Sequence, residues 1–485
     1  MTLRNFCAWL LLLCASPAGV RAEIPSGQLY VGSATISITP DERVALSGQM
    51  RLRVSSGVES PCMATALAVE TRKGEESLEQ AIFVSCDLVS LRGSFYSDLR
   101  QKLQGRIPDS VLPKIMANAT HTHTGPEMEE GRFILPESGV MHPGEYRDFL
   151  MDQLAKVVVQ AWESRVPGQV AWGLGYAVIA HNRRAVYADG SAAMYGKTNN
   201  PKFRGIEGSP DPGVEILYFW DAQDKLVATA INVSCPSQEV ENGNYVNADY
   251  WHEVRENIRK KHGAGVNVVA WCGSAGDQSP HLIYRKAAEQ RMQKLRGINA
   301  LQDLGQRIAS TWEDVLSVVQ KDKHSNLLFE HRTAMIHLPS REITQAEAAA
   351  SQQAADAIKD KNRYRQKLWY LGVVDRFNIQ QAGKAKDYEM ELHAIRLGDI
   401  AIVTNDFELF TDYGVQIKAR SPALQTFVIQ LSGGGSYLPT ERAIAGGSYS
   451  AIPQSNRVGP PGGQVLVDES VKLIQSLWPA PTPKK

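Results

Sequence analysis

Short apolar runs alternate with longer amphipathic stretches along most of this chain, and this alternation restricts its fold more than any other feature. The apolar runs predict strands at 29–38, 62–69, 80–87, 111–120, 169–179, 214–220, 226–234, 266–272, 390–397, 400–404 and 427–431. The stretches between them predict helices at 90–104, 145–164, 249–262, 285–319, 344–371, 405–419 and 465–478. This order is typical of an α/β fold, here one large domain with a mixed sheet or sheets flanked by helices.

The first 22 residues have the pattern of a secretory signal peptide. Arg4 precedes an apolar run at 6–15, and Val20-Arg21-Ala22 offers small residues for cleavage. The apolar run is too short to span a bilayer, and the later chain has no uninterrupted run of about 18 apolar residues. We therefore expect a secreted or periplasmic protein with a mature domain at 23–485 and no transmembrane segment.

Positive and negative charges are balanced, with 52 basic and 52 acidic side chains. Without an excess of positive charge there is no electrostatic attraction to nucleic acid or to anionic membranes, so we expect neither as a partner. Four cysteines, Cys62, Cys86, Cys235 and Cys272, follow the leader. In an oxidising compartment they can form one or two disulfides, and their spacing does not match a zinc finger.

Two histidines mark the end of the apolar run at 111–120, where the sequence reads Asn-Ala-Thr-His-Thr-His-Thr-Gly-Pro over 118–126. Side chains two residues apart on a strand point to the same face, so His121 and His123 are predicted to lie close together. A histidine pair alone is also common as ordinary surface or core structure. A zinc site needs one or two further ligands, which must come from elsewhere in the chain.

A second polar cluster follows the predicted strand at 266–272 and reads Gly-Ser-Ala-Gly-Asp-Gln-Ser-Pro-His over 273–281. Its small residues let backbone amides approach a ligand closely, and Ser279 is a candidate nucleophile or proton relay. The alternative is an ordinary turn, because the segment lacks the G-x-S-x-G pattern of a nucleophile elbow.

Two long irregular segments, 124–144 and 181–212, interrupt the strand and helix pattern, and loops of this length are often lids or binding segments. Glu408 lies near the start of the helix predicted at 405–419, where a carboxylate is either an ordinary N-terminal charge or a ligand. The glycine-rich segment 432–440 carries a tyrosine but lacks the lysine of a phosphate-binding loop.

The segment 118–126 closely resembles the N-A-T-H-T-H-S-G-P signature of the neutral/alkaline ceramidase family, and 275–281 resembles its A-G-D-V-S-P-N element. Weaker similarities follow in the family's order at 31–40, 84–87, 182–183, 407–411, 436–440 and 447–449. In the first of these, Ser37 replaces the family's aspartate. The resemblance covers nearly the whole mature chain and implies the family's catalytic domain without its C-terminal immunoglobulin-like domain.

In that family one zinc ion is held by two histidines, a glutamate and a tyrosine, and it activates the water that attacks an amide carbonyl. Carried over by motif, the resemblance implies His121, Glu408 and Tyr437 as zinc ligands. It also implies catalytic and substrate-binding residues around the reacting centre. These are His123, Asp277 and Ser279 as catalytic residues and Asn182, Arg183 and Gln238 as substrate-binding residues.

Cys235 stands where the family's second histidine ligand is expected. As a thiolate it binds zinc well, although its negative charge makes the metal a poorer Lewis acid. Alternatively, Cys235 is in a disulfide, for example with Cys272, and His252 or His281 completes the site.

The resemblance implies a secreted zinc-dependent hydrolase that cleaves an N-acyl amide bond in a ceramide-like lipid. A second hypothesis keeps the metal site but has a more polar exported substrate, such as a glycan or an acidic conjugate, because both long loops are rich in polar and charged residues. Arg183, Arg184, Lys197 and Arg204 can pair with a carboxylate or sulfate. A third hypothesis is a binding protein with a degenerate site.

Overall fold

The computed structural model describes residues 25–478, so the predicted signal peptide lies outside the described residues. Within this range the fold is built on a twelve-stranded mixed sheet. Its strands are β1 Ser26–Ser37, β2 Met63–Lys73, β3 Glu76–Cys86, β4 Ile115–Ala119, β5 Val166–Tyr176, β10 Gly213–Asp221, β11 Leu226–Val233, β12 Asn267–Cys272, β14 Asn326–Leu338, β15 Tyr388–Leu397, β16 Ile400–Thr404 and β18 Gln425–Ile429. The sheet branches at β1. One edge of β1 pairs with β2, and the other edge pairs with β14 and β5.

In the twelve-stranded sheet, three pairs of neighbouring strands run parallel, namely β3 with β4, β11 with β12 and β16 with β18. Backbone hydrogen bonds join the carboxyl ends of these pairs. The Ala119 N–H donates to the Leu431 carbonyl at 3.1 Å, and the Gln430 N–H donates to the Cys272 carbonyl at 2.9 Å. The loops that follow these strands therefore meet, in the kind of place where α/β proteins hold their ligands.

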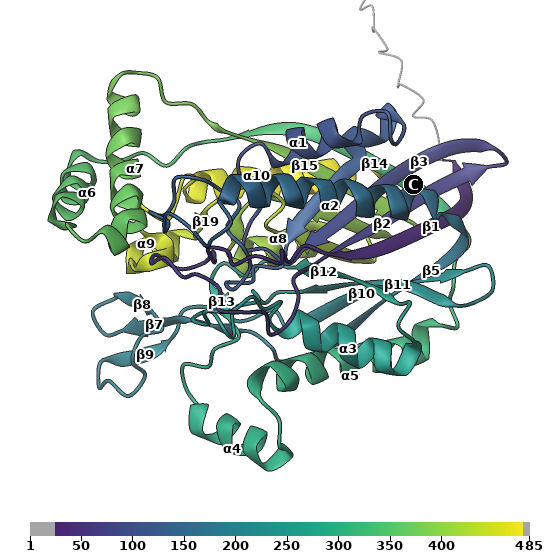
Figure 1. Cartoon of the computed structure of the whole chain (residues 1–485), viewed down its shortest axis with the longest axis horizontal. Helices are drawn as coiled ribbons and strands as arrows, with labels where there is room; N and C mark the ends of the chain where they lie inside the picture. The colour runs from purple at the N-terminus through teal and green to yellow at the C-terminus, as the bar shows by residue number, and fades with distance from the viewer. Residues whose placement is uncertain (1–24, 479–485) are drawn as a thin grey trace, which may run out of the picture.

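Helices cover the outer faces of the sheet (Figure 1). α2 (Pro143–Glu163) packs on β1 and β2, with α1 (Phe95–Leu103) beside it. α5 (Ala300–Val319) packs on β5 and β10, with α3 (Tyr250–His262) beside it. α10 (Pro460–Gln475) packs on β14 and β15, and the neighbouring α8 (Thr411–Arg420) packs on β18.

The sheet is buried on both faces, as β2 illustrates. Ala64, Ala66 and Ala68 belong to the apolar cluster under α2, whereas the alternate residues Leu67 and Val69 belong to a second cluster on the opposite face. A sheet enclosed in this way needs strands that are apolar on both sides, which explains why the apolar runs of the sequence are nearly continuous.

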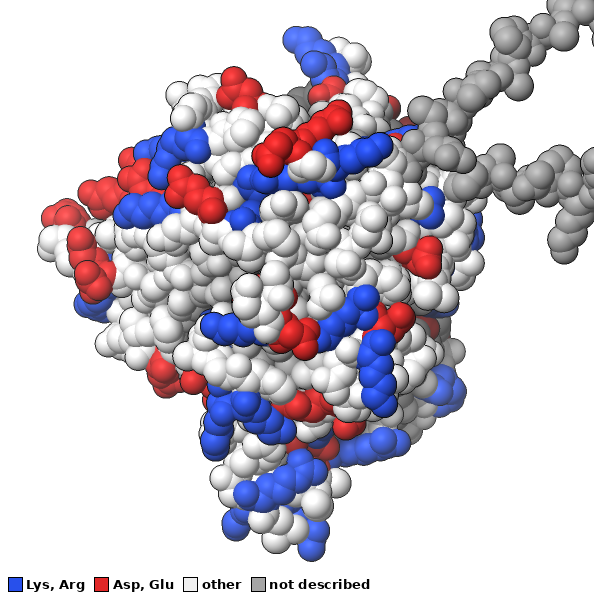
Figure 2. All heavy atoms as spheres, turned by 90° about the vertical axis from the view of Figure 1, so that its right-hand side faces the viewer, with Lys and Arg blue, Asp and Glu red and all other residues white. Residues whose placement is uncertain are grey.

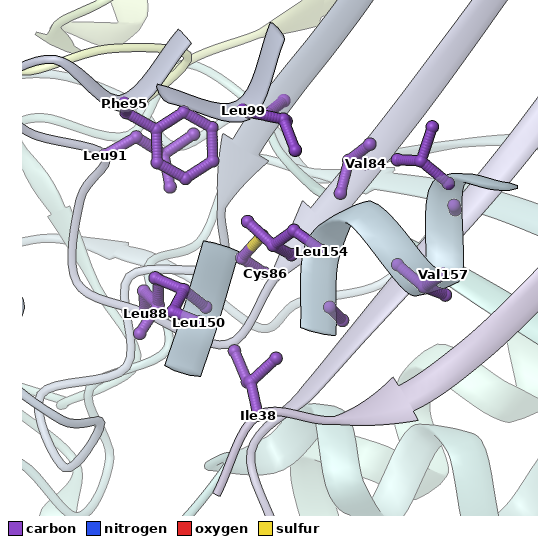
Figure 3. Close-up of a cluster of buried hydrophobic side chains, with 14 of the residues drawn as sticks. Ile38, Val84, Cys86, Leu88, Leu91, Phe95, Leu99, Leu150, Leu154 and Val157 are labelled. Atoms are coloured by element: carbon purple, nitrogen blue, oxygen red, sulfur yellow. The ribbon is translucent and has the colours of Figure 1, made fainter. Parts of the chain in front are cut away.

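The cluster under α2 joins helix and strand side chains from distant parts of the sequence (Figure 3). Leu150 and Leu154 of α2 lie beside Cys86 of β3, with Phe95 and Leu99 of α1 packed above them. This packing holds the end of β3, from which the first loop of the candidate site begins.

The remaining elements are short or lie outside the main sheet. The helices are α4 Lys286–Arg296, α6 Gln345–Ala357, α7 Tyr364–Gln381 and α9 Glu441–Gly446, with 3₁₀ turns at Asp109–Lys114, Lys361–Arg363 and Tyr449–Ala451. Three small sheets pair β6 His181–Asn182 with β13 Gln278–Ser279, β17 Glu408–Leu409 with β19 Tyr437–Leu438, and β7 Arg184–Tyr187 with both β8 Ala192–Met194 and β9 Phe203–Ile206.

The predicted α/β class is confirmed, but three helix boundaries are wrong. The helix predicted at 285–319 is two helices, because Gly297 takes a left-handed conformation (φ 67°) and Asn299 caps α5. The helix predicted at 344–371 divides into α6 and α7, since the chain is extended at Ile358 and restarts after Asp360 caps the following turn. The helix predicted at 405–419 starts only at Thr411, so Glu408 lies on β17 instead of at a helix start.

Two strand predictions also need correction. The strand predicted at 111–120 begins as a 3₁₀ turn containing Pro113, and only Ile115–Ala119 is extended. β14 was not predicted at all, because Glu330, His331 and Arg332 break its apolar run.

Lys and Arg side chains are interspersed with Asp and Glu on the face that Figure 2 shows, as expected for a chain without net charge. In the described part of the chain, no helix combines the length and the apolar character needed to cross a bilayer. The four described cysteines are buried and free, so the structure holds none of the predicted disulfides between them.

Candidate active site

His121 and His123 meet just beyond the end of β4. Their Nε2 atoms are 3.2 Å apart. The strand ends at Ala119, and His121 has a positive φ of 71°, a conformation that costs energy for a side chain of this kind. The two rings therefore converge because the chain turns at His121, and not through the strand alternation that the sequence predicts.

The orientation of His121 is set by its other ring nitrogen. Nδ1 lies 2.7 Å from the Val89 carbonyl, and because a carbonyl only accepts, Nδ1 must carry the hydrogen. In the neutral ring this leaves a lone pair on Nε2, which faces Glu408 Oε2 at 3.4 Å. Metal-binding histidines are commonly held by such a second hydrogen bond.

Glu408 and Tyr437 come together through a ladder of only two residue pairs. β17 and β19 run parallel, and Glu408 is the direct partner of Tyr437. Burial by itself raises the pKa of Glu408, but His121, Tyr437 and Arg183 outweigh it and lower that pKa to about 2. Glu408 is therefore an anion at neutral pH, beside the Nε2 lone pair of His121.

Arg183 holds the tyrosine side of the site. Its Nη2 donates to the Tyr437 hydroxyl at 3.0 Å and to the Gly276 carbonyl at 2.9 Å. The guanidinium also lies between two aromatic rings, 5.5 Å from the ring centre of Tyr437 and 5.9 Å from that of Tyr195. Burial raises the pKa of Tyr437 well above its ordinary value, and the charge of Arg183 offsets part of this rise.

His123 is fixed by a tight backbone approach and faces a carboxylate. Gly48 has a φ of 94°, and a Cβ at that position would lie 2.6 Å from His123 Cγ. His123 Nδ1 faces Glu241 Oε2 at 3.4 Å. Burial lowers the pKa of His123 to about 4, so its ring is neutral near pH 7.

Two glutamates that the sequence analysis did not predict, Glu239 and Glu241, lie on the other side of His123. His281 is between them, with Nε2 at 3.5 Å from Glu239 Oε2 and Nδ1 at 3.8 Å from Glu241 Oε1. Burial, and then the charge of Glu241, raise the pKa of Glu239 to about 7. The sequence contains one signal for these two glutamates, which is their spacing. Both follow the end of β11 and lie two residues apart.

Asp249 anchors the loop that carries these glutamates. Its buried carboxylate accepts from the Val240 N–H at 3.0 Å and from the Tyr250 N–H at 2.9 Å. Burial raises the pKa of Asp249 to about 7. When the pKa of an acid is higher in the folded state than in the unfolded state, the folded protein loses stability as pH rises from the unfolded-state pKa to the folded-state pKa.

We therefore expect Asp249→Asn to gain stability relative to the wild type as pH rises from about 4 to about 7, and to keep a constant difference above that. Urea unfolding of both proteins at several pH values measures this difference. A difference that does not change with pH between 4 and 8 would contradict the assignment.

Ser279 lies in a hydrogen-bonded group with Tyr195 and Gln238. Its Oγ accepts from Gln238 Nε2 at 3.2 Å and from the His281 N–H at 3.0 Å, and it lies 2.9 Å from the Tyr195 hydroxyl. Gln238 Nε2 also donates to Tyr195 at 3.0 Å. With both lone pairs of Ser279 occupied, its hydrogen goes to Tyr195, which leaves the Tyr195 hydrogen for a ligand.

Asp277 and Asn182 hold the loops together. One oxygen of Asp277 accepts from Asn182 Nδ2 at 2.8 Å, and the other accepts from the Thr411 N–H at 3.0 Å and hydroxyl at 2.8 Å. These bonds occupy the Asp277 carboxylate, so in this structure it positions β6, β13 and α8 relative to one another.

Cys235 contacts backbone carbonyl groups. Its buried thiol contacts the carbonyls of Ile179 at 3.4 Å and Pro236 at 3.6 Å, and burial raises its pKa well above the ordinary value. Among the described residues, His252 on α3 makes no side-chain bond to the cluster, and no group of three or more His, Cys, Asp and Glu side chains has metal-binding geometry. The side chains that do converge are His121, His123, Glu408 and Tyr437.

A cavity of about 700 Å³ opens beside this cluster, with Glu408 and Tyr437 in its wall. Its other walls come from α7, from the loop at 129–132 and from the segment 449–457. The cluster is therefore accessible from a space large enough for a small molecule.

Two solved structures share this fold. A crystal structure of neutral ceramidase from Pseudomonas aeruginosa has a TM-score of 0.67 and 16% identity, over 95% of this chain and 76% of that one. A structure described as ceramidase complexed with C2 has a TM-score of 0.66 and 16% identity, over 94% and 77%. No family model and no curated protein matches the sequence. The likeness confirms the fold that the sequence motifs predicted.

Proposed function

We propose that this chain is a secreted zinc-dependent hydrolase that cleaves an N-acyl amide bond. The observation that carries the proposal is the convergence of His121, His123, Glu408 and Tyr437 from three separate parts of the sequence. The ceramidase fold supports it, because the motifs that carry these residues are the ones that resemble that family.

The chemical types of the donor atoms are ones that zinc prefers. His121 Nε2 presents a lone pair, because Nδ1 donates to Val89. If His123 Nδ1 likewise directs its hydrogen to Glu241, then His123 Nε2 also presents a lone pair. The two Nε2 atoms are 3.2 Å apart and lie next to the anionic carboxylate of Glu408. Zinc prefers nitrogen and oxygen ligands of this kind.

In this proposal His123 takes the place that the sequence analysis gave to Cys235. The thiol makes its contacts with backbone carbonyls, whereas the His123 ring already faces His121. We propose His121, His123, Glu408 and Tyr437 as the zinc ligands. Imidazole in place of thiolate leaves the metal a stronger Lewis acid.

Hydrolysis forms a bond between the carbonyl carbon and the water oxygen and breaks the C–N bond, and the amine leaves with both protons of the water. Zinc, when bound, supplies the Lewis acidity that makes hydroxide available near neutral pH. Glu241 holds the proton on His123 Nδ1, and Arg183 holds the Tyr437 oxygen. The Tyr195 hydroxyl, supported by Ser279 and Gln238, donates to the carbonyl oxygen or to the leaving nitrogen.

Metal analysis of the purified protein together with an amidase assay tests the proposal. We expect about one zinc per chain, loss of activity on chelation and recovery on zinc addition. His121→Ala is expected to lose both metal and activity. His337→Ala, which removes a histidine that is 57% exposed on β14, is the matched control. A protein that cleaves amides at the same rate without metal would overturn the proposal, and a metal-free, inert protein would support a binding role.

Ser279→Ala and Tyr195→Phe are each expected to lower kcat about 100-fold while fold and zinc content stay unchanged. Because the two hydroxyls act through one hydrogen-bonded chain, the double variant is expected to lose little more than either single variant. Steady-state kinetics and metal analysis of the three variants measure this. Multiplicative losses would mean that the two hydroxyls act independently.

A further inference from the structure

The cavity beside Glu408 and Tyr437 is lined mainly by charged and aromatic side chains. The basic residues in its wall are Arg92, Arg132, Arg365, Arg376, Lys386 and Arg457. The acidic residues are Glu129, Glu130, Asp387 and Glu408. Met50 and Leu368 are the aliphatic or thioether side chains in the lining, which gives little surface for the two alkyl chains of a ceramide.

Most of these cations have no carboxylate partner. Arg132 is the exception, because it pairs with Glu129 at 2.5 Å and with Glu127 at 3.4 Å. Within residues 25–478, Arg92, Arg365, Arg376 and Arg457 form no ion pair. Arg92, Arg365 and Arg376 donate to neutral groups, such as Arg92 to the Ser90 hydroxyl at 2.7 Å and Arg365 to the Gln49 carbonyl at 2.8 Å.

Neighbouring guanidinium groups in the cavity wall also repel one another. Burial, and then the charge of Arg132, lower the pKa of Arg365 to about 9. Burial, and then Arg457, lower the pKa of Arg376 to about 10. An anion bound among these side chains would remove part of this repulsion and form charge-assisted hydrogen bonds.

Aromatic rings connect the basic part of the cavity with the candidate zinc ligands. Trp369 of α7 lies 5.7 Å from Tyr449, with 30° between the ring planes. Tyr449 in turn lies 5.7 Å from Tyr437, edge to face. A continuous row of aromatic rings therefore runs from α7 to Tyr437, along which the body of a substrate can lie.

We propose that the substrate carries a compact anionic group, a carboxylate or a sulfonate or sulfate, which binds Arg92, Arg365 and Arg457 while the scissile amide lies at Glu408 and Tyr437. The inference rests on the proposed amide hydrolysis and adds the substrate class to it. It makes acidic N-acyl conjugates, and not neutral ceramides, the preferred substrates.

A matched series of short amides tests this by binding, apart from turnover. The probes are N-hexanoylglycine, N-hexanoyltaurine and neutral N-hexanoylethanolamine, titrated calorimetrically into full-length protein treated with a chelator. We expect the two acids to bind about tenfold or more tightly than the alcohol, and the difference to shrink with added salt. Comparison of the glycine and taurine compounds distinguishes a carboxylate preference from a sulfonate preference.

Arg365→Gln and Arg457→Gln are each expected to reduce the affinity for the acids about tenfold and to leave that for the neutral amide unchanged. Arg363→Gln is the matched control, because Arg363 is exposed, lies two residues before Arg365 and does not line the cavity. Arg457 is exposed, so its variant should fold even if that of Arg365 does not.

Equal affinity for acidic and neutral probes would overturn the substrate class, and so would loss of acid binding in Arg363→Gln alone. If the acids bind selectively but zinc-loaded protein cleaves no amide, the anion site stands and the proposed hydrolysis fails. Efficient cleavage of a short-chain ceramide with no cleavage of the acidic amides would support hydrolysis and overturn the anionic substrate.

Discussion

Replacing Glu408 by glutamine is expected to reduce amide hydrolysis by about a thousandfold or more and to weaken zinc binding by at least about a hundredfold, while the fold stays intact. Glutamine has nearly the same shape but no charge, so the negative ligand beside His121 and Tyr437 is lost. Titration with zinc and steady-state kinetics on one amide measure the two effects separately.

Glu389→Gln is the control, because Glu389 is 65% exposed on β15 and makes only a distant contact with His337. We expect it to match the wild type in both measurements. A Glu408→Gln variant that keeps full zinc affinity would remove Glu408 from the ligand set, whatever its activity.

Arg255→Leu is expected to lower the free energy of unfolding by about 3–5 kcal/mol. Arg255 of α3 and Asp87 after β3 form a fully buried ion pair with two hydrogen bonds, at 2.6 and 3.0 Å. Removing the guanidinium leaves the Asp87 carboxylate buried with only the Met63 N–H and the Thr120 hydroxyl as partners. Urea unfolding at pH 7 measures the loss.

Lys261→Leu removes a positive charge from the same helix and is expected to change stability by less than about 1 kcal/mol, because Lys261 is 65% exposed and lies 3.6 Å from Glu313. The double variant Asp87→Asn/Arg255→Leu is expected to recover part of the loss, since no charge then remains buried. An Arg255→Leu protein as stable as the wild type would show that the pair contributes nothing net.

The proximity of the two histidines was predictable because they are two residues apart in one local motif. The predicted reason was wrong, since the turn at His121 and not strand alternation brings the two rings together. Glu408 and Tyr437 are different, since only the family resemblance connected them. Their proximity depends on a two-residue ladder between β17 and β19 that leaves no trace in hydrophobic periodicity.

Tyr195, Glu239 and Glu241 were not predicted as site residues for a related reason. Each lies on an irregular segment, where the side-chain direction depends on distant contacts and not on a repeating backbone geometry. Tyr195 even requires a positive φ of 53° to reach Ser279. Cys235 was expected as a ligand only from its place before a proline in the motif, and in the structure its thiol contacts the Ile179 carbonyl.

Helix α7 supplies Arg365, Trp369 and Arg376 to the cavity, yet along its length only Val373 is buried, in a small cluster separate from the main cores. Figure 1 shows α6 and α7 together at one end of the molecule, outside the layers that cover the sheet. We therefore expect substitutions at the exposed positions of this helix to cost little folding energy, because those side chains contribute nothing to the main cores. Selectivity for the substrate can then be altered on α7 separately from the residues proposed to cleave the bond.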